Sequence, residues 1–207
     1  MFLEYHFVTN VTLVGREAAW SILCVYGWQT MKRYIITGTP GCGKTSVIRA
    51  LELTGASVVS EAATDLIAFR QAQGDMTPWK HPDFIDDIIR LQKHRQIDMC
   101  GDNSDLHFYD RSPICTYALA IYLGSKPSHN LMNEIQRIHK YDIYEKHVFF
   151  FENLGFITNT DARKISFDDS LKFEQIHRET YAKFDYECVV VPAARIDERV
   201  KIILDSI

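Results

Sequence analysis

The feature that most restricts the fold of this sequence is the segment from Gly38 to Thr45, which reads Gly-Thr-Pro-Gly-Cys-Gly-Lys-Thr. Two glycines separated by four residues and followed by Lys-Thr have the spacing of a phosphate-binding loop. The glycines allow backbone N–H groups to point at phosphate oxygens at the start of a helix, whose dipole also favours negative charge. Such a loop requires a strand before it and a helix after it, so it limits the chain to an α/β fold.

We expect this loop to bind a nucleoside triphosphate together with Mg²⁺. Lys44 is expected to reach the β- and γ-phosphates, and the Thr45 hydroxyl is an expected ligand of Mg²⁺. ATP is the expected nucleotide, with GTP as the alternative. The other expected nucleotide contacts come from Gly38, Pro40, Gly41, Cys42, Gly43 and Ser46.

Short apolar runs alternate with amphipathic segments along the rest of the chain. The runs predict strands at 34–37, 56–60, 106–109, 147–151 and 188–191. Helices are expected from the loop to Gly55, at about 62–73, at 82–99 beginning with Pro82, from Pro113 to Gly124 with Ser112 as N-cap, at about 129–139, from the cap residues Ser166 and Asp169 to about Phe184, and at 196–207. Because such alternation implies βαβ units, the sequence predicts a three-layer P-loop NTPase fold with a five-stranded parallel sheet.

Polar or glycine residues follow four of the predicted strands, namely Gly38, Glu61, Asp110 and Glu152. The carboxyl ends of parallel strands meet at one edge of a sheet, so we expect these residues to converge there. The strand that ends at Asp110 is expected beside the loop strand. Asp110 is then placed to hold Mg²⁺, directly or through water, or to accept a proton from a substrate hydroxyl. The alternative is an aspartate that only ends a strand and caps a helix.

Arg111 follows Asp110 at a position where motor-type ATPases usually carry a glutamate that activates water. The planar fork of an arginine binds phosphoryl oxygens, which favours phosphate transfer over a hydrolytic motor. An ion pair with Asp110 or Glu61 is the alternative. Glu61 is either the group that takes the proton from the accepting hydroxyl or a solvated residue at a strand end.

Two further positions are candidates for substrate contacts. Trp79 can stack on a planar ring or pack beneath a loop. Arg163 and Lys164 lie in the loop after the fourth strand, where small-molecule kinases place a basic lid that closes over the phosphates. An exposed basic pair is the alternative for these two residues.

Five short motifs occur in the order Ile-Thr-Gly-Thr-Pro-Gly-Cys-Gly-Lys-Thr-Ser, Ser-Glu-Ala-Ala, Pro-Trp, Phe-Tyr-Asp-Arg-Ser and Thr-Asp-Ala-Arg. Together they resemble the NadR/Ttd-type P-loop ATPases that carry the AAA label. That family is similar to the ribosylnicotinamide kinase domain of the bacterial NAD regulator and, more distantly, to deoxynucleoside kinases with their Asp-Arg-Ser motif. The resemblance covers about residues 32–207. Thr64 stands where many relatives have an arginine, so we carry over no substrate contact at this position.

The resemblance implies a nucleoside/nucleotide-kinase-like fold and a Mg²⁺-dependent phosphotransferase. Such an enzyme moves the γ-phosphate of ATP to a small hydroxyl-bearing acceptor, such as a nucleoside or a ribosyl compound. The charge of the transferring group would be stabilised by Lys44, Arg111 and Arg163, with Asp110 or Glu61 as the base. The alternative is a nucleotide-binding regulatory ATPase or GTPase module that acts through a partner.

The charge and the cysteine pattern narrow the expected partners and location. The net charge is −4 with dispersed Lys and Arg, so no nucleic-acid polymer is expected as a partner. An odd number of cysteines, five, without CxxC spacing favours a reducing cytoplasm over a disulfide scaffold. No zinc site is expected, and His107 and His147 are predicted to lie in the core. The sequence favours no particular oligomeric state.

Residues 1–30 differ from the rest of the chain because they are aromatic and apolar, with Glu4, Arg16 and Glu17 as their charged residues. The uncharged run 18–31 is too short to span a bilayer, so no membrane segment is expected. We interpret residues 1–30 as an amino-terminal extension and 31–207 as the P-loop domain, with a natural chain start at Met31. Inclusion of the extension in the core fold is the alternative.

We predict that a chain beginning at Met31 folds and binds nucleotide, because every motif lies after this residue. Far-ultraviolet circular dichroism and the thermal stabilisation by Mg-ATP should match those of the full-length protein. An insoluble truncation beside a soluble full-length protein would show instead that residues 1–30 cover a face of the core.

Overall fold

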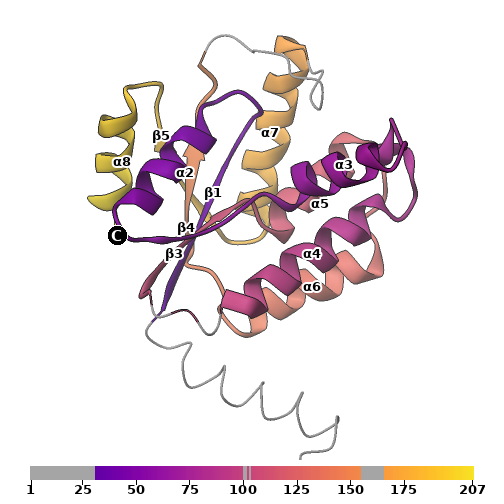
Figure 1. Ribbon diagram of the computed structural model, residues 1–207, viewed down its shortest axis with the longest axis horizontal. Coiled ribbons are helices and arrows are strands. Elements are labelled where there is room, and N and C mark those ends of the chain that lie inside the picture. The colour runs from indigo at the N-terminus through magenta and orange to yellow at the C-terminus, as the bar shows by residue number, and fades with distance from the viewer. Residues whose placement is uncertain (1–30, 100–101, 103, 155–165) are drawn as a thin grey trace, which may run out of the picture.

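The computed structural model describes residues 31–99, 102, 104–154 and 166–207. Its centre is a five-stranded sheet in which every neighbouring pair of strands is parallel, in the order β2-β3-β1-β4-β5 (Figure 1). This confirms the predicted five-stranded parallel sheet. It also confirms that the strand ending at Asp110 lies beside the strand that leads into the phosphate-binding loop. The strands are β1 (Lys32–Gly38), β2 (Ser57–Val59), β3 (Leu106–Asp110), β4 (His147–Phe151) and β5 (Glu187–Val191).

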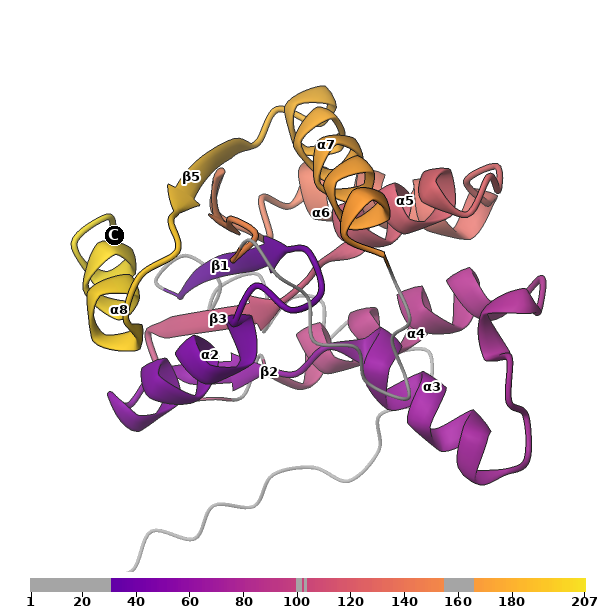
Figure 2. The ribbon, with the colours of Figure 1, turned by 90° about the horizontal axis from the view of Figure 1, so that it is seen from above.

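Helices cover both faces of the sheet, which makes the three expected layers. Figure 2 shows α2 and α8 on one side, with α5, α6 and α7 on the other. The helices α3 and α4 extend this second side beyond β2. A short 3₁₀ helix, η1, contacts both of them. Their bounds are α2 (Lys44–Leu53), α3 (Ala62–Ala72), η1 (Pro78–Lys80), α4 (Phe84–Asp98), α5 (Pro113–Tyr122), α6 (His129–Lys140), α7 (Phe167–Lys183) and α8 (Ile196–Leu204).

Alternating side chains of β1 build the two main cores of the domain. Tyr34 and Ile36 pack in the cluster that includes Leu51 of α2 and Ile203 of α8. Ile35 points to the opposite face and belongs to the cluster formed with α5, α6 and α7. Successive residues of a strand face opposite sides of the sheet, so a strand that is buried on both sides is apolar throughout. The end of β1, where the phosphate-binding loop begins, is therefore fixed from both faces.

A third and smaller cluster lies under α3 and α4. Ala62, Phe84 and Ile88 are its buried members, and Ile67 and Leu119 pack against it. We call this group the α3–α4 cluster. It contains no residue of the five strands.

Several predicted boundaries shift for identifiable reasons. β1 starts two residues early because Lys32 and Arg33 continue its pairing with β3. The helix predicted to begin with Pro82 begins at Phe84, because a turn between the Phe84 N–H and the His81 carbonyl (3.1 Å) precedes it. The last helix ends at Leu204 rather than at Ile207.

The structure also tests the predictions for two helix N-caps and for two histidines that were expected in the core. Ser166 caps α7, since its hydroxyl accepts from the Asp169 N–H at 3.1 Å. Ser112 is the N-cap residue of α5, but its hydroxyl lies 3.1 Å from the hydroxyl of Tyr181 on α7. His107 is buried, as predicted. The prediction for His147 is wrong: this residue starts β4, is half exposed, and lies 3.3 Å from the Glu187 carboxylate.

Among the residues described, no helix combines the length and the apolar character that a bilayer crossing needs. The amino-terminal extension lies outside the described residues, so its predicted role stays a prediction.

Candidate active site

The phosphate-binding loop joins β1 to α2 through residues that only glycine fits well. Gly38, Gly41 and Gly43 have positive φ angles of 138°, 83° and 80°. A Cβ atom on Gly38 would lie 2.5 Å from the carbonyl oxygen of Phe151, which ends the neighbouring strand β4. Left-handed backbone and a close backbone approach are the two reasons for glycine at such positions. The loop shape is thus required by its contacts with the sheet.

Lys44 opens α2 with its side chain folded into the loop. Its ammonium donates to the carbonyl oxygens of Gly38 and Thr39, at 3.2 and 3.1 Å, and it is 5% exposed. The next two residues, Thr45 and Ser46, are exposed on the first turn of the helix. A buried cation, a helix N-terminus and two accessible hydroxyls therefore meet at the predicted phosphate site.

Asp110 ends β3 directly beside the loop strand. Its Cα pairs in register with that of Ile36, and the next residue, Arg111, donates its backbone N–H to the Ile36 carbonyl at 3.0 Å. The carboxylate of Asp110 and the hydroxyl of Thr45 are oxygen donors, the ligand type that Mg²⁺ prefers in nucleotide sites. The donor set thus fits the predicted metal.

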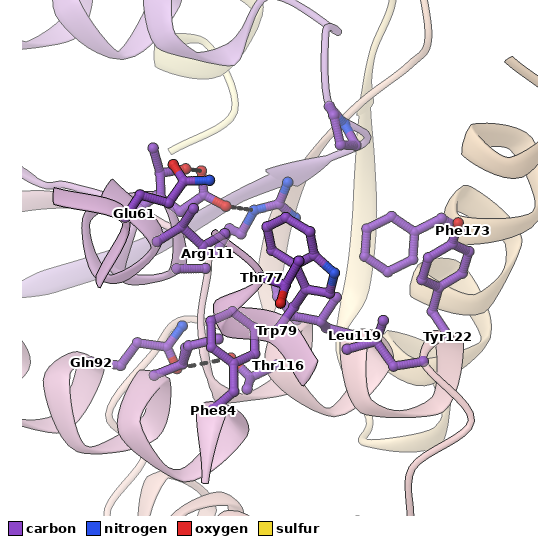
Figure 3. A pocket seen from close by; sticks show the side chains of 18 of the residues that line it. Glu61, Thr77, Trp79, Phe84, Gln92, Arg111, Thr116, Leu119, Tyr122 and Phe173 are labelled. Atoms are coloured by element: carbon purple, nitrogen blue, oxygen red, sulfur yellow. Dashed lines mark hydrogen bonds and ion pairs between the residues drawn. The ribbon is translucent and has the colours of Figure 1, made fainter. Parts of the chain in front are cut away.

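Arg111 turns away from the strand direction, with a φ of 75° that is uncommon outside glycine. Its Nε donates to Glu61 Oε1 at 2.5 Å (Figure 3). The hydroxyl of Thr64 donates to the other carboxylate oxygen of Glu61 at 2.7 Å. The ion pair predicted as one alternative for Arg111 is present, and Thr64 holds the same carboxylate.

The charge of Arg111 is maintained by this pairing. Burial, the largest single effect, lowers the pKa of the guanidinium, but Glu61 together with the smaller effects of Cys115, Asp110 and Cys42 raises the pKa of Arg111 above its ordinary value. The pair is almost enclosed, with side-chain exposures of 9% for Arg111 and 12% for Glu61. Water screens such a pair weakly, so its geometry is firmly held.

His177 of α7 is the functional candidate that the sequence analysis missed. Its Nδ1 lies 2.9 Å from the Phe173 carbonyl and must carry the proton there, since a carbonyl only accepts. Nε2 is then an acceptor, and Arg111 Nη1 lies 3.4 Å from it. Burial first, and then the charge of Arg111, lower the pKa of His177 to about 3. A histidine in a long amphipathic helix gives no sequence signal for this contact, because Arg111 lies 66 residues earlier.

A cavity of about 530 Å³ opens next to the loop. Pro40, Glu61 and Arg111 line one part of it, and most of the remainder is formed by α3, η1, α4, α5 and α7. Figure 3 shows aromatic side chains from these elements around the space, together with a Gln92–Thr116 hydrogen bond of 3.1 Å. The aromatic members are Trp79, Phe84, Tyr122 and Phe173.

The site thus combines residues from several predicted positions. The loop residues and Asp110 lie at the ends of adjacent strands, and Glu61 and Arg111 are in contact. Glu152 follows β4 at the same edge, where its carboxylate lies 3.9 Å from Arg178 Nη2. Arg163 and Lys164 lie outside the described residues, so their lid role stays a prediction.

Comparisons with known proteins identify a family and a fold. A family profile described as an AAA domain matches residues 33–199. The crystal structure of NadR protein in complex with NR is similar, with a TM-score of 0.63 and 15% identity, over 88% of this chain and 53% of that chain. This chain therefore spans about half the length of that protein. No curated protein sequence matches it.

Deoxyadenosine kinase from M. mycoides has the same fold. Its structure with bound dATP gives a TM-score of 0.55 at 15% identity, over 84% of this chain and 98% of that chain. Its structure with bound dCTP gives 0.51 at 15% identity, over 85% and 98%. The kinase-like P-loop fold and the resemblance to NadR-type proteins are both confirmed.

The neutral state of His177 predicts a pH dependence of stability. The unfolded chain takes up a proton at this histidine near the ordinary pKa of 6.5, whereas the folded protein does so only near 3. The contribution of His177 to stability is therefore complete above about pH 6.5 and is lost as the pH falls toward 3. His177→Gln should flatten the fall in the free energy of unfolding between about pH 7 and 5, measured by urea unfolding.

His129→Gln, which changes an exposed histidine at the start of α6, is the matched control and should keep the wild-type slope. Parallel curves for wild type and His177→Gln would contradict the assigned protonation state.

Proposed function

Because the chain belongs to the AAA domain family, we propose that it is a Mg²⁺-dependent phosphotransferase that moves the γ-phosphate of ATP to a small hydroxyl-bearing acceptor. The acceptor class is a nucleoside or a related ribosyl compound. The single observation that carries this proposal is the cavity beside the phosphate-binding loop, with a carboxylate and a guanidinium in its wall.

The size and lining of the cavity support a small-molecule acceptor. About 530 Å³ lies within the range of ordinary ligand pockets. Its aromatic side chains suit a planar ring, and Trp79 is one candidate for stacking. The NadR structure contains NR and the deoxyadenosine kinase structures contain dATP or dCTP, which agrees with a ligand of this class.

Glu61 is the base that the cavity favours. It lines the cavity, whereas Asp110 does not belong to its lining. The contacts with Arg111 and Thr64 hold the Glu61 carboxylate in one orientation, as a positioned proton acceptor requires. Asp110 is then a ligand of Mg²⁺ rather than the base that takes the proton of the acceptor.

In the proposed step, the acceptor oxygen forms a bond to the γ-phosphorus while the bond from phosphorus to the bridging oxygen breaks and ADP leaves. The hydroxyl proton passes to Glu61. Lys44 and Arg111 stabilise the negative charge of the transferring group through donors that are already in place. Mg²⁺ bound by Thr45 and Asp110 would neutralise charge on the β- and γ-phosphate oxygens.

We predict Mg²⁺-dependent thermal stabilisation by ATP or GTP, because a ligand that binds only the folded state shifts the unfolding equilibrium. Lys44→Ala should remove most of this shift, since the buried cation at the loop is lost. Lys93→Ala, which removes an exposed lysine of α4, is the control and should behave as the wild type. Equal stabilisation of wild type and Lys44→Ala would exclude the loop as the nucleotide site.

A phosphotransfer screen with nucleosides and nicotinamide riboside tests the reaction. With an identified acceptor, Glu61→Gln should lower kcat by about a hundredfold or more, the scale of losing a general base. The ATP-induced thermal shift should remain, because Glu61 is not part of the loop. Glu52→Gln on the exposed face of α2 is the control. Slow hydrolysis that no acceptor accelerates would favour the regulatory ATPase or GTPase alternative.

A further inference from the structure

A buried arginine from the last helix contacts the phosphate-binding loop from behind. Arg199 of α8 is 3% exposed, and its Nη1 donates to the carbonyl oxygen of Cys42 at 2.8 Å. Its guanidinium lies over the ring of Phe151, 4.4 Å from the centroid. The contact joins residues 157 positions apart. It therefore links the loop to the end of the domain.

The burial of Arg199 destabilises the folded state. Nε and Nη2 have no hydrogen-bond partner within the part of the chain that the structure describes. Burial also lowers the pKa of this guanidinium from its ordinary value, which is the sign of a cation removed from water. Unpaired buried donors destabilise a fold, and an apolar side chain of similar volume often stabilises it more. Packing alone gives no reason for an arginine at this position.

The geometry of the Cys42–Gly43 peptide gives a reason for an arginine at position 199. No cis peptide bond occurs among the described residues. In a planar trans peptide, the carbonyl of one residue and the N–H of the next point to opposite sides. Arg199 holds the Cys42 carbonyl on the side of α8, so the Gly43 N–H is directed to the other side.

Gly43 allows this close approach. A Cβ atom at this residue would lie 2.9 Å from Arg199 Nη1, and the φ angle of 80° is left-handed. Gly43 is also the N-cap residue of α2, where loop amides bind phosphate oxygens in such motifs. Glycine and arginine thus fit each other at the position where the loop becomes a helix.

We propose that Arg199 is a positioning residue for nucleotide binding, which fixes the Cys42–Gly43 peptide so that the Gly43 N–H donates to a phosphate oxygen of the bound nucleotide. The proposal rests on the proposed binding of ATP at the loop, but on neither the identity of the acceptor nor that of the base. The hydrogen bond from Nη1, held in place by a planar guanidinium that lies over the Phe151 ring, sets the peptide orientation rather than the positive charge alone.

Isotope labels on one peptide bond of the protein report on both the Cys42 carbonyl and the Gly43 amide. The sequence contains Cys-Gly twice, at Cys42–Gly43 and at Cys100–Gly101. A full-length Cys100→Ser protein with ¹³C-carbonyl cysteine and ¹⁵N-glycine should therefore give one Cys-Gly signal, from the Cys42 carbonyl and the Gly43 amide. Addition of Mg-ATP should shift the Gly43 proton downfield as the amide donates to phosphate.

Arg199→Met and Arg199→Lys are compared in this background, with Lys201→Met on the exposed face of α8 as control. Arg199→Met should weaken Mg-ATP binding at least about tenfold by calorimetry, the scale of one charge-assisted hydrogen bond. At saturating ATP, its Gly43 shift should be clearly smaller than in the wild type. Arg199→Lys should restore affinity and shift only in part, because an ammonium cannot both lie as a planar group over Phe151 and direct a donor to the Cys42 carbonyl. Lys201→Met should change neither.

The outcomes separate the two proposals. Normal affinity and a normal Gly43 shift in Arg199→Met overturn the positioning role while the proposed function stands. Weaker binding with a full Gly43 shift also overturns it, because the arginine then acts by charge alone. Full rescue by Arg199→Lys overturns it for the same reason. Absence of ATP binding by the wild type overturns the proposed function and this inference together. If Arg199→Met fails to fold, Arg199→Lys alone decides between the oriented guanidinium and its charge.

Discussion

The pairing of β1 with parallel neighbours on both edges is the constraint on which the site depends. It places the end of β3, with Asp110 and Arg111, directly beside the start of the phosphate-binding loop. On the other edge, β4 brings the Phe151 carbonyl so close to Gly38 that no side chain fits there. The loop therefore takes its shape from two neighbouring strands as well as from its own glycines.

The Glu61–Arg111 ion pair ties the helical side of the cavity to the sheet. Glu61 belongs to the start of α3 and Arg111 to the end of β3, and His177 adds a contact from α7. Removing one member of a buried pair leaves an uncompensated charge, so the three elements hold each other in place. The same groups that would handle the proton and the phosphate also keep the cavity in shape.

The sequence predicted the helices and strands well wherever the interactions that determine them join residues close together in the chain. Apolar strands, a glycine-rich loop and the cap at Ser166 all have their cause within a few residues, so their positions could be inferred from the pattern. Contacts between distant residues could not. The acceptor role of His177 toward Arg111, the Arg199–Cys42 contact and the use of the Ser112 hydroxyl by Tyr181 depend on how helices pack on the finished sheet. The strand was correctly predicted to begin at His147, but this residue was wrongly placed in the core because the first residue of a strand lies at the end of the sheet, where its side chain is exposed.

The α3–α4 cluster has a consequence for how such a protein can change over evolution. Ile67, Phe84, Ile88 and Leu119 line the cavity and belong to this cluster, which includes no strand residue. The phosphate-binding loop, Asp110 and Arg111 are instead anchored on the ends of β1 and β3. Substitutions in the cluster can thus remodel the walls of the cavity while the phosphate-binding loop and the residues at the strand ends stay unchanged. For the proposed phosphotransfer, a lineage with this architecture can exchange one acceptor for another by substitutions in a few apolar side chains while it keeps its nucleotide site.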